Sequence, residues 1–221
     1  GDVCKRQRLD ESANIIMFEK DEYISFANCG LPYYIGGEIT DQEALTLQTP
    51  DSFKARFNVD VRNFNEVTAI TPETKTVTVY NHQLQKEYQE SYDKLLLSMG
   101  AKPIKPNIPG INSNKVFTLR NIPDTYAIKE YVDTHKPKHA IVVGGGFIGI
   151  EMAENLHSTG INVTIVEMAN QVISPIDYEM ACEVHQHLIS KGINLVLETE
   201  LQAINEADNK LTVTLNNQTV D

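Results

Sequence analysis

The chain has 221 residues, of which 41% are hydrophobic and 22% are charged, enough for one large or two ordinary folded cores. The formal net charge of −11 argues against a nucleic-acid partner, because neutralising phosphates requires clustered lysines and arginines. No apolar run approaches the roughly 20 residues of a membrane span, and the widely spaced cysteines Cys4, Cys29 and Cys182 favour a reducing, cytoplasmic setting.

The first half of the chain has an apolar segment at residues 14–19, which predicts a buried strand ending in an acidic residue. Residues 59–79 predict strands and a hairpin, and residues 93–97 predict a further strand before Gly100. Residues 103–123 contain four prolines and are the predicted linker to the second half.

The second half alternates predicted strands and helices. Residues 139–143 are an apolar strand, followed by a glycine-rich loop and an amphipathic helix that stops at Gly160. Residues 162–166 predict a second strand, residues 178–190 a helix, and residues 193–197 a third strand. This order implies a parallel sheet with crossover helices, and residues 201–215 then predict a hairpin.

The two halves resemble each other. Residues 14–19 match residues 162–167 in type except at Thr164. Ala69-Ile70 matches Ala203-Ile204, and Lys75 matches Lys210, at nearly the same offset in numbering. We therefore expect an α/β fold with two Rossmann-like dinucleotide-binding units, each combining a parallel sheet, crossover helices and an antiparallel β-meander. The first unit, residues 1–110, lacks an initial strand and glycine loop, and the second, residues 111–221, stops within its hairpin, so the fold is expected to be truncated at both ends.

The pattern Gly144-x-Gly146-x-x-Gly149 lies between a predicted strand and a predicted helix, the context that a dinucleotide-binding loop needs. Gly144 allows the tight turn, Gly146 lets the backbone approach a pyrophosphate, and Gly149 allows close helix–strand packing. Glu167 ends the next predicted strand, where an acid accepts hydrogen bonds from ribose hydroxyls and repels a 2′-phosphate. The sequence thus predicts NADH over NADPH; the alternative is a glycine-rich turn without a ligand. The predicted loop also includes Phe147 and Ile148.

Glu19 occupies the same place in the first half as Glu167 does in the second. It is therefore predicted to bind the ribose of a second dinucleotide. The alternative is an exposed carboxylate at the end of a strand.

Cys29 is followed by Gly30 and Pro32, so that a helix can begin close to its sulfur and favour a reactive thiolate. Ser25 and Asn28 are typical capping residues that can donate hydrogen bonds to sulfur or to a bound thiol. No second cysteine follows nearby; Tyr33 and Tyr34 occupy the positions of a possible resolving partner. A lone cysteine must react with an external thiol compound, peroxide or oxygen, forming a mixed disulfide or a sulfenic acid. The alternative is a small buried hydrophobic residue.

Residues 23–37, Tyr-Ile-Ser-Phe-Ala-Asn-Cys-Gly-Leu-Pro-Tyr-Tyr-Ile-Gly-Gly, closely resemble the active-site segment of coenzyme A disulfide reductases and their relatives, the persulfide reductases, NADH oxidases and NADH peroxidases. Residues 15–20, 92–103 and 118–125 resemble further blocks of the same FAD-dependent pyridine nucleotide-disulfide oxidoreductase family. Members are homodimers of about twice this length, and the resemblance covers essentially the whole chain.

The resemblance implies a function and its residues. Cys29 would be the redox nucleophile, Ser25 and Asn28 would contact coenzyme A, and Arg8 would lie near its phosphates, although a solvated helix face is an equally open interpretation of Arg8. Residues 1–110 would form an incomplete FAD-binding domain and residues 111–221 a shortened NAD-binding domain. The residues implied in FAD binding are Glu19, Lys20, Val61, Gly100 and Arg120.

Electrons would then pass from NADH through the flavin to Cys29 and a small disulfide or persulfide. Two alternatives remain open: an NADH oxidase or peroxidase that uses a sulfenic acid, and a nucleotide-binding module without catalysis. A metal site is not expected, because the six histidines are scattered and His185 and His187 would lie on different faces of one helix.

Overall fold

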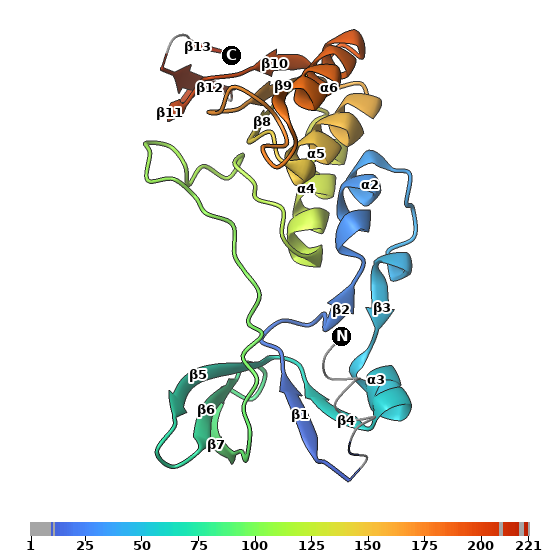
Figure 1. Ribbon diagram of the computed structural model, residues 1–221, viewed down its shortest axis with the longest axis vertical. Coiled ribbons are helices and arrows are strands. Elements are labelled where there is room, and N and C mark those ends of the chain that lie inside the picture. Colours follow the sequence, from blue (N-terminus) through green and yellow to red (C-terminus); the bar gives the residue numbers. More distant parts are fainter. Residues whose placement is uncertain (1–9, 11, 208–209, 217–218, 221) are drawn as a thin grey trace. The chain divides into compact units, whose positions relative to one another are not determined.

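The computed structural model describes residues 10, 12–207, 210–216 and 219–220. The chain divides into two compact units, a first unit of Gly1–Ala27 with Glu43–Ala101 and a second unit of Asn28–Gln42 with Lys102–Asp221 (Figure 1). Cys4 and Arg8 lie outside the described residues. By packing, therefore, the segment around Cys29 belongs with the second half of the chain.

The first unit contains a two-stranded parallel sheet and an antiparallel β-meander. In the parallel sheet, Ile15 pairs with Val59 and Phe18 with Arg62. The helix before the second of these strands starts with a capping box, in which the side chain of Thr49 accepts from the Ser52 backbone N–H. The elements are β1 (Ile15–Phe18), β2 (Ser25–Phe26), η2 (Glu43–Leu45), β3 (Thr46–Gln48), α3 (Pro50–Phe57), β4 (Val59–Arg62), β5 (Asn65–Thr71), β6 (Thr76–Asn81) and β7 (Lys86–Ser91).

A small apolar core and a polar cluster stabilise this unit. Val59 and Val79 are fully buried. Nearby in the sequence, Arg62 donates to Glu90 at 2.7 Å, and the buried Asn65 side chain accepts from Tyr88 Oη at 3.0 Å. These bonds connect strand β4 and the start of β5 to β7.

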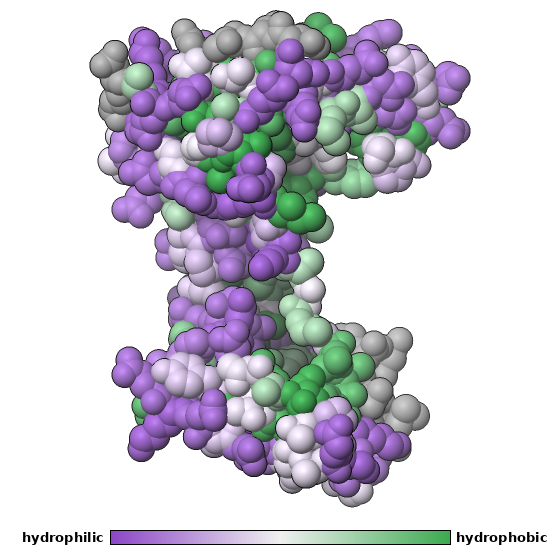
Figure 2. Space-filling model, turned by 90° about the vertical axis from the view of Figure 1, so that its left-hand side faces the viewer, coloured by the Kyte–Doolittle hydropathy of each residue, from purple (hydrophilic) through white to green (hydrophobic). Residues whose placement is uncertain are grey.

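The strand predicted at residues 93–97 is not formed. A strand exists only where a neighbouring backbone pairs with it, and within the described residues β1 and β4 pair only with each other. Leu95, Leu96 and Leu97 consequently remain 39%, 44% and 54% exposed. These leucines are among the exposed apolar residues of the first unit. Figure 2 shows where apolar residues reach the surface on one face of the molecule.

The second unit is built on a parallel sheet of three strands in the order β10-β9-β8. Val143 pairs with Val166, and Val196 pairs with Val166 from the other side. The elements are η1 (Asn28–Gly30), α2 (Leu31–Gly36), α4 (Ile122–His135), β8 (His139–Val143), α5 (Phe147–Ser158), β9 (Asn162–Val166), α6 (Tyr178–Ser190), β10 (Asn194–Val196), β11 (Leu201–Ala207), β12 (Lys210–Leu215) and β13 (Thr219–Val220).

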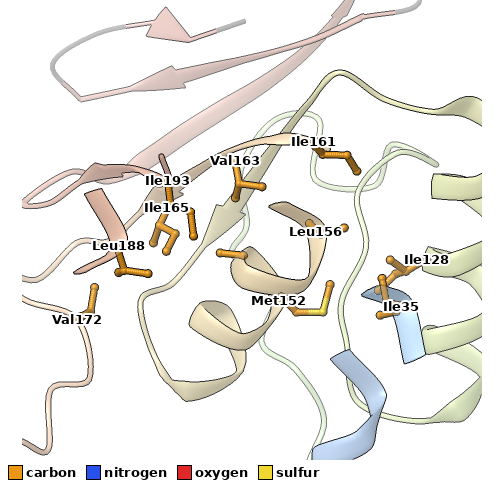
Figure 3. Close-up of a cluster of buried hydrophobic side chains, with 11 residues drawn as sticks. Ile35, Ile128, Met152, Leu156, Ile161, Val163, Ile165, Val172, Leu188 and Ile193 are labelled. Atoms are coloured by element: carbon orange, nitrogen blue, oxygen red, sulfur yellow. The ribbon is translucent and has the colours of Figure 1, made fainter. Parts of the chain in front are cut away.

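Strand β9 is buried on both faces, as expected for the centre of a parallel sheet. Val163 and Ile165 pack against the helices α5 and α6, in a cluster that includes Leu156 and Leu188 (Figure 3). The opposite face carries Val166, which packs with residues of the meander strands β11 and β12. The sheet is thus covered by helices on one side and by the meander on the other (Figure 1).

The predicted duplication is visible in the backbone. Each meander has an irregularity at the same place: register shifts occur before Ala69 in β5 and before Ala203 in β11. Ile70 pairs with Val77, and Ile204 pairs with Val213. The hairpin of the second meander is longer than that of the first. The difference in numbering between the two returning strands is therefore larger than the difference between the two matched lysines. The proposed match of Lys75 to Lys210 is therefore slightly out of register.

No helix in the described part of the chain has both the length and the apolar character that a membrane crossing requires.

We predict that Ile165→Ala lowers the free energy of unfolding of the second unit by about 2–5 kcal/mol, because Ile165 is fully buried and its truncation leaves a cavity. The matched control is Ile189→Ala, where the side chain is 60% exposed and a change within about 0.5 kcal/mol is expected. Urea denaturation of the two variants measures the difference. Equal losses would contradict the assigned core.

Candidate nucleotide and thiol sites

The glycine loop between β8 and α5 has a distinct requirement at each glycine. Gly144 has φ +107°, a conformation that residues with a side chain rarely adopt, and its N–H donates to Val166 O at 2.8 Å. A Cβ on Gly149 would collide with the Gly144 carbonyl oxygen. Gly146 precedes α5, and a Cβ there would meet no atom within 4 Å. The backbone at Gly146 is therefore open to a ligand.

Gly145, which the sequence pattern left unassigned, is hydrogen-bonded through both its N–H and its carbonyl group. Its N–H donates to Glu167 Oε2 at 2.6 Å, and its carbonyl accepts from the Ile173 N–H at 2.8 Å. A Cβ on Gly145 would lie 2.8 Å from Val172 Cγ1. The signal in the sequence was the run of three consecutive glycines, of which the spacing pattern uses only two.

Glu167 connects this loop to the end of β9. Besides the bond to Gly145, its Oε1 accepts from the Ala169 N–H at 2.7 Å. A carboxylate offers about four acceptor positions, so hydroxyl groups of a ligand could still donate to it. The exposed apolar side chains of Phe147 and Ile148 lie in the first turn of α5, next to the loop.

Glu19 has the same backbone surroundings at the end of β1. Its Oε1 accepts from the N–H of Asp21, two positions later, as Glu167 does from Ala169. Its own N–H donates to Arg62 O at 3.0 Å, as the N–H of Glu167 does to Val196 O at 2.9 Å. The two strand ends are therefore built alike.

The other residues implied in flavin binding are divided between the two units. Lys20 is exposed beside Glu19, Val61 is buried in β4, and Gly100 is exposed with φ +71°. These three belong to the first unit, whereas Arg120 belongs to the second, where its backbone N–H donates to Asp124.

Cys29 is an exposed free thiol in the 3-10 turn Asn28–Gly30, immediately before α2. The helix that follows has only 6 residues, and no side chain caps it, because Gly30 is at the N-cap position. Neither Ser25 nor Asn28 caps α2. Ser25 instead lies in β2 of the first unit, where it pairs with Gln48.

Tyr33 lies one helical turn after Cys29 and faces several acidic groups. Glu151 of α5 is the main cause that raises the pKa of the Tyr33 hydroxyl, with partial burial, Glu154 and Glu38 adding to the effect. The hydroxyl therefore keeps its proton to higher pH than an ordinary tyrosine does. The position of a possible resolving cysteine is thus taken by a hydrogen-bond donor.

Helix α2 is fixed to the helix that carries the glycine loop. Ile35 is fully buried in the cluster that contains Met152 of α5. At Gly36 the two helices approach so closely that a Cβ would collide with the Asn155 side chain, and Tyr34 contacts Tyr126 of α4. The thiol segment and the glycine loop therefore share one packed unit.

The other described free cysteine, Cys182, has different surroundings. It is half-buried on α6, where it raises the pKa of Tyr178 through a charge interaction and a hydrogen bond. Within the described residues, no group of three or more His, Cys, Asp or Glu side chains could hold a metal ion.

Residues 4–221 match the pyridine nucleotide-disulphide oxidoreductase family. The chain belongs to this family. It is 40% identical over 208 residues to a coenzyme A disulfide reductase of Staphylococcus haemolyticus, an alignment that covers 93% of this chain and 47% of that protein. The chain therefore spans about half the length of the curated relatives it matches.

Solved structures of the same family superpose closely. Reduced CoADR-RHD of Bacillus anthracis is 52% identical with a TM-score of 0.94, covering 99% of this chain and 39% of that one. The water-forming NADH oxidase of Lactobacillus brevis, bound to NADH, is 30% identical with a TM-score of 0.91, covering 99% and 48%. An engineered, NADPH-bound form of that oxidase is 29% identical with a TM-score of 0.91, and the match covers 100% of this chain and 49% of that one. These likenesses confirm the α/β fold and the family that the sequence indicated.

We predict that Gly144→Ala destabilises the second unit by about 1–3 kcal/mol, because the positive φ at this position strains any residue with a side chain. Gly146→Ala is the matched comparison and should change stability by no more than about 0.5 kcal/mol, since a Cβ there meets open space. Thermal and urea unfolding measure both variants. The reverse order of stability would show that the loop has a different conformation.

Proposed function

We propose that this chain is the nucleotide- and thiol-binding portion of an NADH-dependent flavoprotein disulfide reductase acting on a small disulfide such as coenzyme A disulfide. The observation that carries the proposal is the exposed Cys29, which directly precedes α2, a helix that packs on α5, the helix that begins at the glycine loop. Membership of the pyridine nucleotide-disulphide oxidoreductase family supports it.

The proposed site for the nicotinamide coenzyme is the loop of Gly144, Gly146 and Gly149. The open backbone at Gly146 and the free N–H groups at the start of α5 suit a pyrophosphate. Glu167, which already holds the loop through Gly145, would accept from the ribose hydroxyls. Its negative charge would repel a 2′-phosphate and favour NADH.

The engineered relative supports this preference. Among its substitutions are a glycine changed to alanine and, later in that chain, an aspartate changed to alanine, and it is described as an NADPH oxidase. Gly149 and Glu167 have the same spacing in this sequence as those two positions have in the oxidase. In this chain an alanine at position 149 would collide with the Gly144 carbonyl, so the loop would have to move. The acid at position 167 would be the other determinant.

The proposed site for FAD begins at Glu19, whose backbone surroundings repeat those of Glu167 and suit the ribose of a second dinucleotide. Bound there, the flavin would supply the two-electron chemistry that links NADH to a disulfide. The further residues assigned to it are Lys20, Val61, Gly100 and Arg120.

The proposed reaction at Cys29 is thiol–disulfide exchange. Its thiolate attacks one sulfur of the substrate disulfide, the substrate S–S bond breaks, and one thiolate leaves as a mixed disulfide forms with Cys29. Reduction of this mixed disulfide takes two protons and two electrons, which NADH would supply through the flavin, and it would release the second thiol and regenerate Cys29. Tyr33, which follows Cys29 by one turn and has a raised hydroxyl pKa, is the proposed donor of a hydrogen bond to sulfur. Ser25, Asn28 and Arg8 are the proposed contacts with coenzyme A, in a homodimer of the longer protein.

The second candidate function is reduction of oxygen or peroxide through a sulfenic acid on Cys29. The observation that favours it is the close superposition on the NADH oxidase of Lactobacillus brevis. An exposed thiol with no second cysteine close to it in the sequence is compatible with both reactions.

Replacing the thiol tests the proposed function directly. In the longer protein containing this chain, loaded with FAD, Cys29→Ser should lower NADH-dependent reduction of coenzyme A disulfide by more than about 1000-fold, because the attacking sulfur is lost. Cys182→Ser, the control thiol, should retain activity. Assays with peroxide and oxygen as acceptors decide between the two candidates. Unchanged turnover of all three acceptors in the Cys29→Ser protein would refute both.

The coenzyme preference is tested at Glu167. Glu167→Gln should raise the ratio of NADPH to NADH affinity about tenfold, because the charge that repels a 2′-phosphate is removed. Affinity for NADH should also fall, since one of the two backbone N–H bonds of the carboxylate is lost. The control is Glu183→Gln, an exposed acid on α6. Fluorescence titration with each coenzyme gives the ratio, and an unaltered ratio would exclude Glu167 as the determinant.

A further inference from the structure

His185 of α6 makes a specific bond to the backbone outside its own helix. Its Nε2 accepts from the Val172 N–H at 3.1 Å. The ring must therefore be neutral, with its proton on Nδ1, because a backbone N–H can only donate. His187, two positions later, is exposed. The two histidines therefore lie on different faces of α6, and of the two it is His185 whose ring bonds the Val172 backbone.

The backbone held by His185 is strained. Ile173, the next residue after Val172, has φ +49°, an uncommon conformation for a β-branched side chain. Such a conformation persists only where the surroundings hold it in place. Here Val172 is fully buried in the core, and the Ile173 carbonyl accepts from the Ile176 N–H at 2.9 Å. The bond to His185 is a further restraint on this short segment.

The strained segment contacts the glycine loop at two points. The Ile173 N–H donates to Gly145 O at 2.8 Å. The Val172 side chain packs against Gly145, where an added Cβ would lie only 2.8 Å from Val172 Cγ1. The other side of Gly145 is held by Glu167 through the N–H. Both polar groups of Gly145 are consequently bound, one by Glu167 and the other by the segment that His185 holds.

We propose that His185 is a positioning residue for the pyridine nucleotide: it fixes Val172 and Ile173, which in turn hold Gly145 and orient the loop toward the pyrophosphate. His185 contacts neither the loop nor the coenzyme in this scheme. The proposal rests on the proposed function of the loop as the NADH site. It predicts that removing the imidazole acceptor weakens NADH binding from a distance.

The test compares three substitutions in the purified chain. His185→Leu removes the acceptor, and His185→Gln supplies a side-chain oxygen that can accept the Val172 N–H. His187→Leu is the control for an exposed histidine on the same helix. NADH affinity is measured by fluorescence titration, folding by circular dichroism, and exchange of the Val172 and Ile173 amide protons by mass spectrometry or NMR.

His185→Leu should weaken NADH binding about tenfold and speed exchange of both amides, while the helical signal is kept. His185→Gln should restore affinity to within about threefold of the parent chain, and His187→Leu should match the parent. In the longer FAD-loaded protein, His185→Leu should raise KM for NADH about tenfold with kcat nearly unchanged. General destabilisation would not produce this split or its rescue by glutamine.

Two failures can be told apart. If the parent chain binds NADH and His185→Leu binds it equally well, or if His185→Gln is as weak as His185→Leu, the positioning role is wrong and the proposed function is untouched. If the parent chain itself does not bind NADH, the assignment of the loop fails, and the role of His185 falls with it.

Discussion

The bond between the Glu167 carboxylate and the Gly145 N–H is the interaction on which the proposed nucleotide site depends. It joins the end of strand β9 to the turn after β8 at 2.6 Å, in a place where parallel strands present their carboxyl ends side by side. The turn must be glycine-rich for this bond to form, because Gly144 has a positive φ and Gly145 has no room for a side chain against Val172. The acid is thus a structural part of the loop as well as its proposed ribose ligand.

Much of the fold could be predicted because its signals are local. The strand at 139–143, the strand at 162–166 and the helix at 178–190 have the predicted bounds, since short apolar runs and helical spacing report directly on burial. The duplication was also detectable, from a few matched residues. The structure adds what sequence spacing could not show, namely that Ala69 and Ala203 follow the same register shift in their meanders.

The features that could not be predicted depend on contacts between distant segments. A strand was expected at 93–97 from its leucines alone, yet a strand also needs a partner, and those leucines are exposed. The run of three glycines did not single out Gly145, and His185 gave no pattern, because what distinguishes them is hydrogen bonds to Glu167 and Val172, which are distant in the sequence. The packing of residues 28–42 with the second unit, instead of with their neighbours in sequence, depends likewise on the fit of Gly36 against Asn155.

This last contact has a chemical consequence. Helix α5 begins at the glycine loop and carries, in its first two turns, Glu151, the main cause of the raised pKa of Tyr33 beside Cys29. Farther along the same helix, Asn155 approaches Gly36 at the end of the thiol segment. A displacement of α5 would therefore change the position of the glycine loop, the charge near the Tyr33 hydroxyl and the packing of α2 at the same time. Because one hydrophobic cluster contains Ile35 of α2 and Met152 of α5, the proposed electron donor and acceptor sites are coupled through close packing, which resists such a displacement.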